Sequence, residues 1–134
     1  GGTLADLDSA GQPLLHKSAA TIVRAVALGM QHAHSRGILH RDLKPANVLL
    51  DTGSPGESQL LISDSSRLEE LGVAIKITDF GLAKFVDEDS NESTRTGALI
   101  GSPAYMAPEL AAARWADVGT ATDVYAMERS CTNS

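Results

Sequence analysis

The chain of 134 residues has a single cysteine, few aromatic residues and no long apolar run. With only Cys131 present, an intrachain disulfide and a zinc site built from several cysteines are both excluded. No stretch of about 18 apolar residues occurs, so the sequence predicts no membrane-spanning helix. The start also lacks a basic region followed by an apolar one, the pattern of a secretory signal. These absences predict a cytoplasmic protein, with any membrane anchor of a longer parent protein lying outside this sequence.

Basic residues are also scarce. Eleven lysines and arginines stand against seventeen acidic residues, which gives a net charge of −6. Such a balance provides no general attraction to nucleic acid or to an anionic membrane, so we expect neither as a partner. A nucleotide is still compatible with it, because a phosphate site needs only a local cluster of donors. The length fits one small domain with an ordinary hydrophobic content of 43%.

The clearest periodic pattern lies between residues 18 and 36. Apolar residues recur there at spacings of four and three, at Ile22, Val26, Met30 and Ala33. This stripe predicts an amphipathic helix over 18–36. Ser18 is expected as its N-cap, and Gly37 stands where a left-handed C-cap residue would fall.

Three short runs after Gly37 predict strands, and a last segment predicts a helix. The runs at 38–40 and 48–50 would flank a charged loop, and the alternating run at 73–78 would form a third strand. The final helix is expected from about Ala121.

Two polar segments separate these elements. Residues 51–72 contain Gly53, Pro55 and Gly56 and predict a loop, with a small strand at 60–62 as an open alternative. Residues 86–97 are too polar to pack against a core, so we expect them to be mobile.

Three clusters of chemically active residues fall in loops or at strand ends, where functional groups concentrate. They span residues 40–47 (His-Arg-Asp-Leu-Lys-Pro-Ala-Asn), 79–81 (Asp-Phe-Gly) and 101–109 (Gly-Ser-Pro-Ala-Tyr-Met-Ala-Pro-Glu). In the first, Asp42, Lys44 and Asn47 place a proton acceptor, a cation and a neutral oxygen ligand on one short turn. In the second, Asp79 is a carboxylate released from a strand next to the flexible Gly81.

These three motifs, in this order, resemble the catalytic loop, the metal-binding motif and the end of the activation segment of protein kinases. The resemblance extends from Gly1 to about Met127. It implies an α+β, protein-kinase-like fold that is partial: mainly the helical C-terminal lobe, with short β-strands around the catalytic loop. Lys44, two places after Asp42, is typical of serine/threonine kinases rather than tyrosine kinases.

The resemblance also implies a chemistry, the transfer of the γ-phosphate of ATP to serine or threonine hydroxyls of a protein substrate. Asp42 would orient the hydroxyl and accept its proton, and Lys44 would reach the γ-phosphate. Asn47 and Asp79 would hold Mg²⁺, a hard cation that prefers oxygen ligands. ATP and Mg²⁺ are therefore the expected cofactors.

Other matched residues are expected to be structural. His40 and Phe80 would pack in the interior, and Asp123 would hydrogen-bond the catalytic-loop backbone. Glu109 would end the activation segment, where family members pair it with an arginine from helices that are not expected in this sequence. We also expect Tyr105 and Trp115 to pack rather than to stack on bases.

Arg41 is the matched position that would bind a phosphate on the activation loop, through charge-assisted hydrogen bonds. Ser93, Thr94 and Thr96 are the candidate phosphorylation sites, and an unmodified polar loop is the alternative. His32 and His34 lie two apart on the predicted helix and would face different ways, so we expect no metal site from them.

Several family features have no counterpart in the sequence. The glycine-rich loop, the strand lysine and the helix with its glutamate partner are not found, so the N-terminal lobe is expected to be absent. Residues 52–72 lengthen the interval between Asn47 and Asp79, and such an insertion is tolerated at a surface. The resulting segments are a post-hinge region (1–17), a helix (18–36), the catalytic-loop region (38–50), an insertion (51–72), the activation segment (73–109) and a truncated helix with a polar tail (121–134).

Three functions follow, in order of preference. The first is a serine/threonine protein kinase whose isolated chain is weak or inactive. The second is a non-catalytic kinase remnant or pseudokinase-like binding module. The third, a small-molecule phosphotransferase of the aminoglycoside-kinase type, is disfavoured because those enzymes would not be expected to carry this catalytic loop followed by Ala-Pro-Glu.

Overall fold

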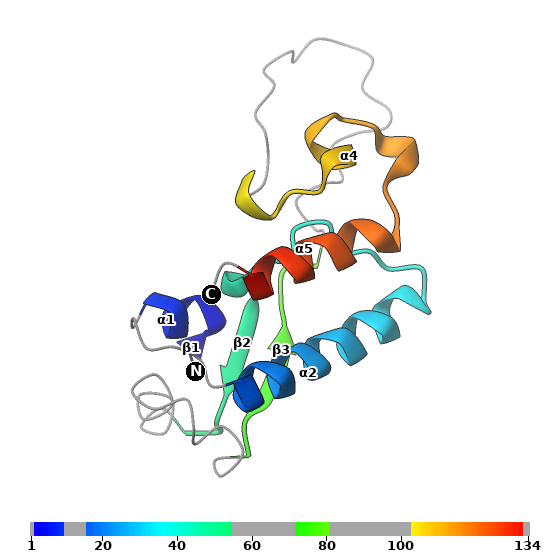
Figure 1. Ribbon diagram of the computed structural model, residues 1–134. Coiled ribbons are helices and arrows are strands. Elements are labelled where there is room, and N and C mark those ends of the chain that lie inside the picture. Colours follow the sequence, from blue (N-terminus) through cyan, green and yellow to red (C-terminus); the bar gives the residue numbers. More distant parts are fainter. Residues whose placement is uncertain (1, 10–15, 55–71, 81–102, 133–134) are drawn as a thin grey trace.

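The computed structural model describes residues 2–9, 16–54, 72–80 and 103–132 (Figure 1). Their elements, in chain order, are β1 (Gly2–Thr3), α1 (Leu4–Ser9), α2 (His16–His34), η1 (Pro45–Asn47), β2 (Val48–Asp51), β3 (Ala74–Ile77), η4 (Pro103–Tyr105), α4 (Pro108–Ala111), η5 (Trp115–Asp117) and α5 (Thr120–Thr132), where η marks a 3₁₀ turn. The predicted strand at 60–62 and the segment 86–97 lie outside the described residues. The described part is α+β, as predicted.

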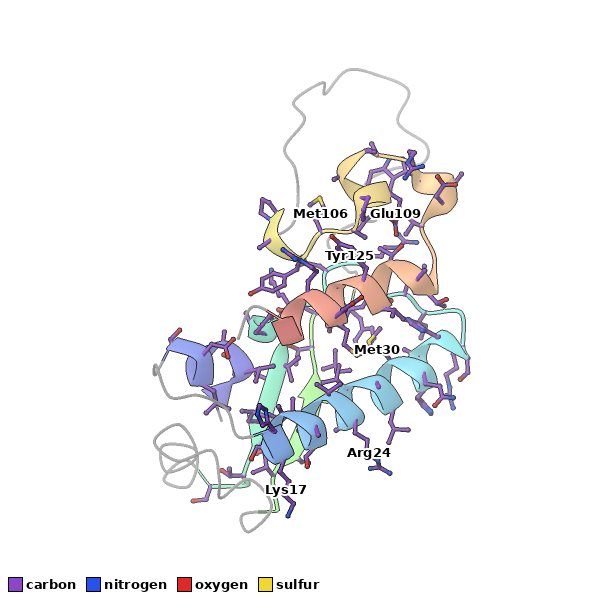
Figure 2. The ribbon with its side chains drawn as sticks, viewed as in Figure 1. Lys17, Arg24, Met30, Met106, Glu109 and Tyr125 are labelled. Atoms are coloured by element: carbon purple, nitrogen blue, oxygen red, sulfur yellow. The ribbon has the colours of Figure 1, made fainter. Side chains whose placement is uncertain are left out.

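Helix α2 confirms the predicted apolar stripe. Its buried residues are Ser18, Ile22, Val26, Met30 and Ala33. Figure 2 shows Met30 between α2 and α5, whereas Lys17 and Arg24 point away from the core. The predicted N-cap is wrong, because the helix begins at His16 and the side chain of Ser18 extends the buried stripe by one turn.

The other end of α2 has the C-cap that the sequence predicted at Gly37, although the helix ends at His34 rather than at residue 36. Gly37 has φ 73°, its N–H donates to His34 O at 2.9 Å, and the N–H of Ile38 donates to Ala33 O at 3.0 Å. These two bonds form a Schellman motif, which satisfies carbonyls at the helix end. The chain therefore leaves α2 in one fixed direction toward the loop that follows.

The described sheet has three strands in the order β1-β2-β3, with both pairs antiparallel. Val48 is opposite Ile77 and Leu50 is opposite Ile75, so apolar residues of β2 and β3 share one face. The predicted strands at 48–50 and 73–78 are thus confirmed.

The predicted strand at 38–40 is wrong. The N–H of Ile38 closes the cap of α2, and the N–H of His40 donates to a side chain of α5. These backbone N–H groups are therefore not available to pair with a neighbouring strand.

The core lies between α2, the sheet and α5 (Figure 1). Its buried members are Leu4, Leu7, Ile22, Val26, Met30, Leu43, Val48, Leu50 and Ala126. A Cβ atom at Gly29 would lie 3.0 Å from Ile77 Cδ1, so α2 packs directly on β3 at this glycine. Leu43 comes from the charged loop itself, and its burial anchors that loop to the core.

Helix α5 lies between α2 and the α4 segment (Figure 1). It runs through Thr132, so residues 128–132, expected as part of a polar tail, are helical. Arg129 in that stretch donates from Nε to Ala104 O at 3.3 Å, and the Ser130 hydroxyl donates to Ala126 O at 2.8 Å. Among the described helices, none combines the length and apolar character needed to cross a bilayer.

The packing expected for Trp115 is wrong, since its side chain is 61% exposed. It lies on η5, a single turn with no buried residue, and such a turn presents no apolar stripe to the core. Tyr105 is partly buried.

Candidate active site

The loop after α2 is held by a carboxylate from the other end of the described chain. Asp123 Oδ2 accepts the N–H of His40 at 2.9 Å, and Oδ1 accepts the N–H of Arg41 at 2.7 Å. The hydrogen bonds predicted from Asp123 to the loop backbone are therefore present. Arg41 has φ 66°, a left-handed conformation that costs a non-glycine residue about 1 kcal/mol or more. The two bonds to Asp123 stabilise this strained turn.

His34 is a site residue that the sequence reasoning missed. Its Nε2 lies 2.8 Å from Asp123 Oδ2, and the two side chains are 15% and 2% exposed. The carboxylate of Asp123 already accepts two amide N–H groups and has no proton to donate. His34 Nε2 therefore carries the proton and donates it in a hydrogen bond to Asp123 Oδ2. His32, two residues earlier, instead meets Arg36 Nη1 at 2.9 Å on the surface. The two histidines contact different partners, as predicted.

His40 joins the loop to the end of β3. It is completely buried, its Nε2–H donates to Thr78 O at 2.8 Å, and its Nδ1 accepts the N–H of Asp42 at 3.3 Å. A carbonyl can only accept, so these two bonds assign the neutral tautomer with the proton on Nε2. The ring also lies 4.8 Å from that of Phe80, which packs against the core. Both residues pack in the interior, as expected, and the bonds of His40 connect the backbone of Asp42 to Thr78.

Asp42 and Lys44 project from the loop on either side of the buried Leu43. Lys44 Nζ donates to Asp42 Oδ2 at 3.0 Å, and the lysine and aspartate side chains are 25% and 32% exposed. The acceptor and the cation predicted for this turn are therefore in contact and reach solvent.

Asn47 closes the same turn. Pro45 begins the 3₁₀ turn η1, where its fixed φ suits the first position. Asn47 Nδ2 donates to Asp42 O at 2.9 Å, and its N–H donates to Lys44 O at 2.9 Å. Within the part of the chain that the structure describes, Asn47 Oδ1 has no hydrogen-bond partner. The hydrogen bond from Nδ2 to Asp42 O thus orients the side-chain amide of Asn47.

Asp79 follows the end of β3, where the pairing with β2 brings the chain close to Asn47. Thr78 N–H donates to Asn47 O at 2.9 Å, and Asp79 follows directly. Asp79 has φ 59°, is exposed, and forms no hydrogen bond with its carboxylate among the described residues. A second strained residue at the same site is a feature of functional turns.

The oxygens of Asn47 and Asp79 fit a magnesium ion. Mg²⁺ is commonly held by one or two protein oxygens and completes its shell with waters and substrate phosphates. Zinc would need more or softer ligands. In the described ranges no group of three or more His, Cys, Asp or Glu residues could hold a metal ion by itself. The donor set is therefore suited to a hard cation that completes its shell with ligands from outside the protein.

Glu109 is tied to α5 beside Asp123. The Thr122 hydroxyl, on a residue 2% exposed, donates to Glu109 Oε1 at 2.7 Å. This bond, a backbone hydrogen bond and the charge of Arg114 hold the pKa of Glu109 below its usual value. Figure 2 shows Glu109 on the α4 segment above α5. Thr122 and Asp123 are consecutive, so the start of α5 holds both Glu109 and the charged loop.

Gly81 and the candidate phosphorylation sites Ser93, Thr94 and Thr96 lie outside the described residues. Arg41 is exposed at the edge of the loop.

Comparisons with known proteins agree with this geometry. The family described as protein kinase domain matches residues 1–131. The chain is 34% identical over 127 residues, 94% of its length, to a protein of Corynebacterium efficiens named "Probable serine/threonine-protein kinase CE0033". It is 30% identical over 95% of its length to the serine/threonine-protein kinase PknB of Mycobacterium tuberculosis, and 32% identical over 95% of its length to that of Mycobacterium leprae. The chain spans only 16 to 17% of the length of these relatives.

Proposed function

Because the chain belongs to the protein kinase domain family, we propose that residues 40–47 and 78–80 form the phosphoryl-transfer centre of a serine/threonine protein kinase. The reaction would move the γ-phosphate of ATP to a serine or threonine hydroxyl of a protein substrate. The isolated chain is proposed to turn over weakly, since the residues that cover the adenine and the inner phosphates in the family have no match in its sequence. The relatives named as serine/threonine kinases support the substrate class.

Asp42 is the proposed catalytic residue. Its carboxylate would orient the substrate hydroxyl and accept its proton, which requires an oxygen within hydrogen-bond reach of that hydroxyl. Burial of Leu43 and the bond from Asp42 N–H to His40 fix the backbone of Asp42, while its side chain reaches solvent. Lys44, now 3.0 Å from Asp42, carries the charge that would contact the γ-phosphate.

Asn47 Oδ1 and the carboxylate of Asp79 would hold Mg²⁺. The ion, when bound with ATP, neutralises charge on the phosphate oxygens. The chain's own contribution is orientation: Asn47 Nδ2 donates to Asp42 O, and the N–H of Thr78, the residue before Asp79, donates to Asn47 O. The observation that carries the proposal is this pair of hydrogen bonds, which join Asp42 to Asn47 and Asn47 to Thr78, the residue before Asp79.

Regulation by phosphate is a further part of the proposal. Arg41 would bind a phosphate on Ser93, Thr94 or Thr96 through charge-assisted hydrogen bonds. Mass spectrometry of the chain after incubation with Mg·ATP and an active kinase would identify such a site.

Thermal unfolding with nucleotide separates the kinase from a pseudokinase-like binding module. Mg·ATP should raise the melting temperature of the chain, and acid-stable label from γ-labelled ATP should appear on serine or threonine of an added protein. Stabilisation without any transfer, at protein in excess over ATP, would favour the binding module. The absence of both stabilisation and transfer would contradict the proposal.

A further inference from the structure

We infer that Arg129 is a positioning residue for the protein substrate of the proposed reaction, because it fixes the turn η4 against α5. The inference rests on the proposed function for its effect on the substrate, but the contact itself does not. Arg129 Nε donates to Ala104 O at 3.3 Å. Arg129 lies in the stretch that the sequence predicted as a polar tail, and it is none of the residues proposed to react.

The turn η4 depends on polar contacts for its position. It has no buried side chain, so apolar packing contributes little to holding it. Figure 1 shows η4 lying over the C-terminal half of α5. Within the turn, the N–H of Met106 donates to Pro103 O at 3.4 Å. Among the described residues, the bond from Arg129 is the hydrogen bond that joins η4 to another element.

Helix α5 contacts the third motif at two points. The Thr122 hydroxyl donates to Glu109 Oε1 near the start of the helix, and Arg129 donates to Ala104 O about two helical turns later. Residues separated by two turns lie on the same face of a helix. One face of α5 therefore holds residues 103–109 near both of their ends.

The same helix also sets where this segment lies relative to the charged loop, because the start of α5 binds the backbone of that loop. Residues 103–109 include none of the residues proposed to bind ATP or Mg²⁺. A shift of η4 would therefore leave nucleotide binding intact and change how a protein substrate is placed at Asp42. The geometry of such placement is what positioning residues contribute to a transfer reaction.

Three substitutions separate the hydrogen bond of Arg129 from its charge. Arg129→Gln keeps an N–H donor at the same position along the side chain as Nε and removes the charge. Arg129→Lys keeps the charge and moves the donor one atom outward, and Arg129→Met removes both at a similar length. Arg24→Met is the control, because Arg24 is exposed on α2 and points away from the core (Figure 2).

The contact is tested by NMR, from the carbonyl ¹³C shift of Ala104 and the amide exchange of Met106. Arg129→Met should move this shift and raise the exchange about fivefold, as expected for the loss of one hydrogen bond. The amide of Leu110, which donates to Ala107 O in α4, should exchange as before. Arg129→Gln and Arg24→Met should both stay close to the unmodified chain.

The effect on the substrate is tested by phosphate transfer to a lysine-rich histone, a basic protein that the charge of Arg129 does not attract. Arg129→Met should raise the apparent KM for the histone about fivefold, with the saturating rate and the Mg·ATP affinity unchanged. Arg129→Gln should recover most of this effect, and Arg129→Lys should recover less.

An unchanged Ala104 shift and Met106 exchange in Arg129→Met would overturn the inference. So would exchange that rises equally at Leu110, because that pattern reports loss of the whole segment. Recovery of KM by lysine and not by glutamine would show that the charge acts rather than the bond to Ala104. If the unmodified chain transfers no phosphate, the proposed function fails, and the NMR measurements alone decide whether Arg129 fixes η4.

Discussion

Asp123 Oδ1 lies 2.7 Å from the backbone nitrogen of Arg41, 82 positions earlier in the chain. The bond joins the first turn of α5 to a strained residue of the charged loop. Its neighbour Thr122 joins the same turn to Glu109. One helix start therefore organises two motifs that are far apart in the sequence, and several predictions depend on it.

Replacement of Asp123 by alanine should strongly destabilise the chain. The amides of His40 and Arg41 would lose their acceptor, and an unsatisfied buried donor costs about 1 to 3 kcal/mol. We expect the free energy of unfolding to fall by about 3 kcal/mol in urea denaturation. Asp117→Ala is the control, because Asp117 forms an exposed pair with Arg114 and should cost about 0.5 kcal/mol or less. Equal losses for the two variants would contradict the role of Asp123.

The metal site can be tested without measuring transfer. Mn²⁺ with a non-hydrolysable ATP analogue should broaden NMR signals of residues 47 and 79 in the unmodified chain. Asn47→Ala and Asp79→Asn should each weaken Mn²⁺ affinity by about tenfold, or about 1.4 kcal/mol. Asp51→Asn, at the other end of β2 and paired with Lys76, should leave the affinity unchanged. Broadening centred on Asp51 instead would refute the assignment.

Glu109 should titrate below the usual range for a glutamate. The hydroxyl of Thr122 is the main cause of its lowered pKa, so Thr122→Val should raise that pKa toward the ordinary value of about 4.3. The measurement is a ¹³C NMR titration of the Glu109 carboxyl group. A pKa that stays low in Thr122→Val would show that another group stabilises the carboxylate.

The sign of the stability effect follows from the direction of that shift. Because folding lowers the pKa of Glu109, the ionised form contributes stability that is fully present above about pH 4.3, and this contribution is lost as the pH falls through the lowered folded-state pKa. Thr122→Val should therefore be less stable than the unmodified chain at pH 7. The difference should shrink toward the acid limit, apart from any effect of the valine itself. A difference that grows on acidification would contradict this linkage.

The buried face of α2 provides a packing test. Ile22 is 2% exposed and Leu28 is 50% exposed on the same helix. Ile22→Ala should lower the free energy of unfolding by about 2 to 5 kcal/mol, whereas Leu28→Ala should change it little. Chemical denaturation of both variants measures the difference. Similar losses would mean that α2 packs through another face.

Local patterns in the sequence predicted much of this fold. The stripe from Ile22 to Ala33 identified α2 and its buried face, and Gly37 identified its cap. Each of these features depends on neighbours within a few residues. The alternating residues at 73–78 predicted β3 for the same reason.

Features that depend on distant partners were harder to predict. The strand expected at 38–40 was wrong because the carboxylate of Asp123 accepts the amides of His40 and Arg41. The motif resemblance predicted that contact, but the local pattern of residues 38–40 does not report it. His34 was missed as a site residue for the same reason, although a histidine at the capped end of α2, a few residues before the motif, was an available signal. Trp115 was expected to pack, but its position on a short turn leaves it exposed.

The site residues were predicted mainly from the resemblance of their motifs to a known family, and less from the physical properties of the sequence. Asp42, Lys44, Asn47 and Asp79 were named from their motifs, and the geometry brings their turns together. Their roles in transfer remain predictions. The hydrogen bonds through His40 and Thr78 that link them could not be derived from spacing, because they cross from the loop to the end of β3.

The most direct test of the central claim is single-turnover phosphate transfer by the purified chain and by its Asp42→Asn variant. Asparagine keeps the shape of Asp42 but cannot accept the proton of the substrate hydroxyl. We expect slow, Mg²⁺-dependent transfer to serine or threonine by the unmodified chain and by Asp117→Asn, and a rate lower by about 10² to 10⁴ in Asp42→Asn. Equal transfer by the chain and by Asp42→Asn, or none by either, would contradict the proposal that these residues form a kinase active centre.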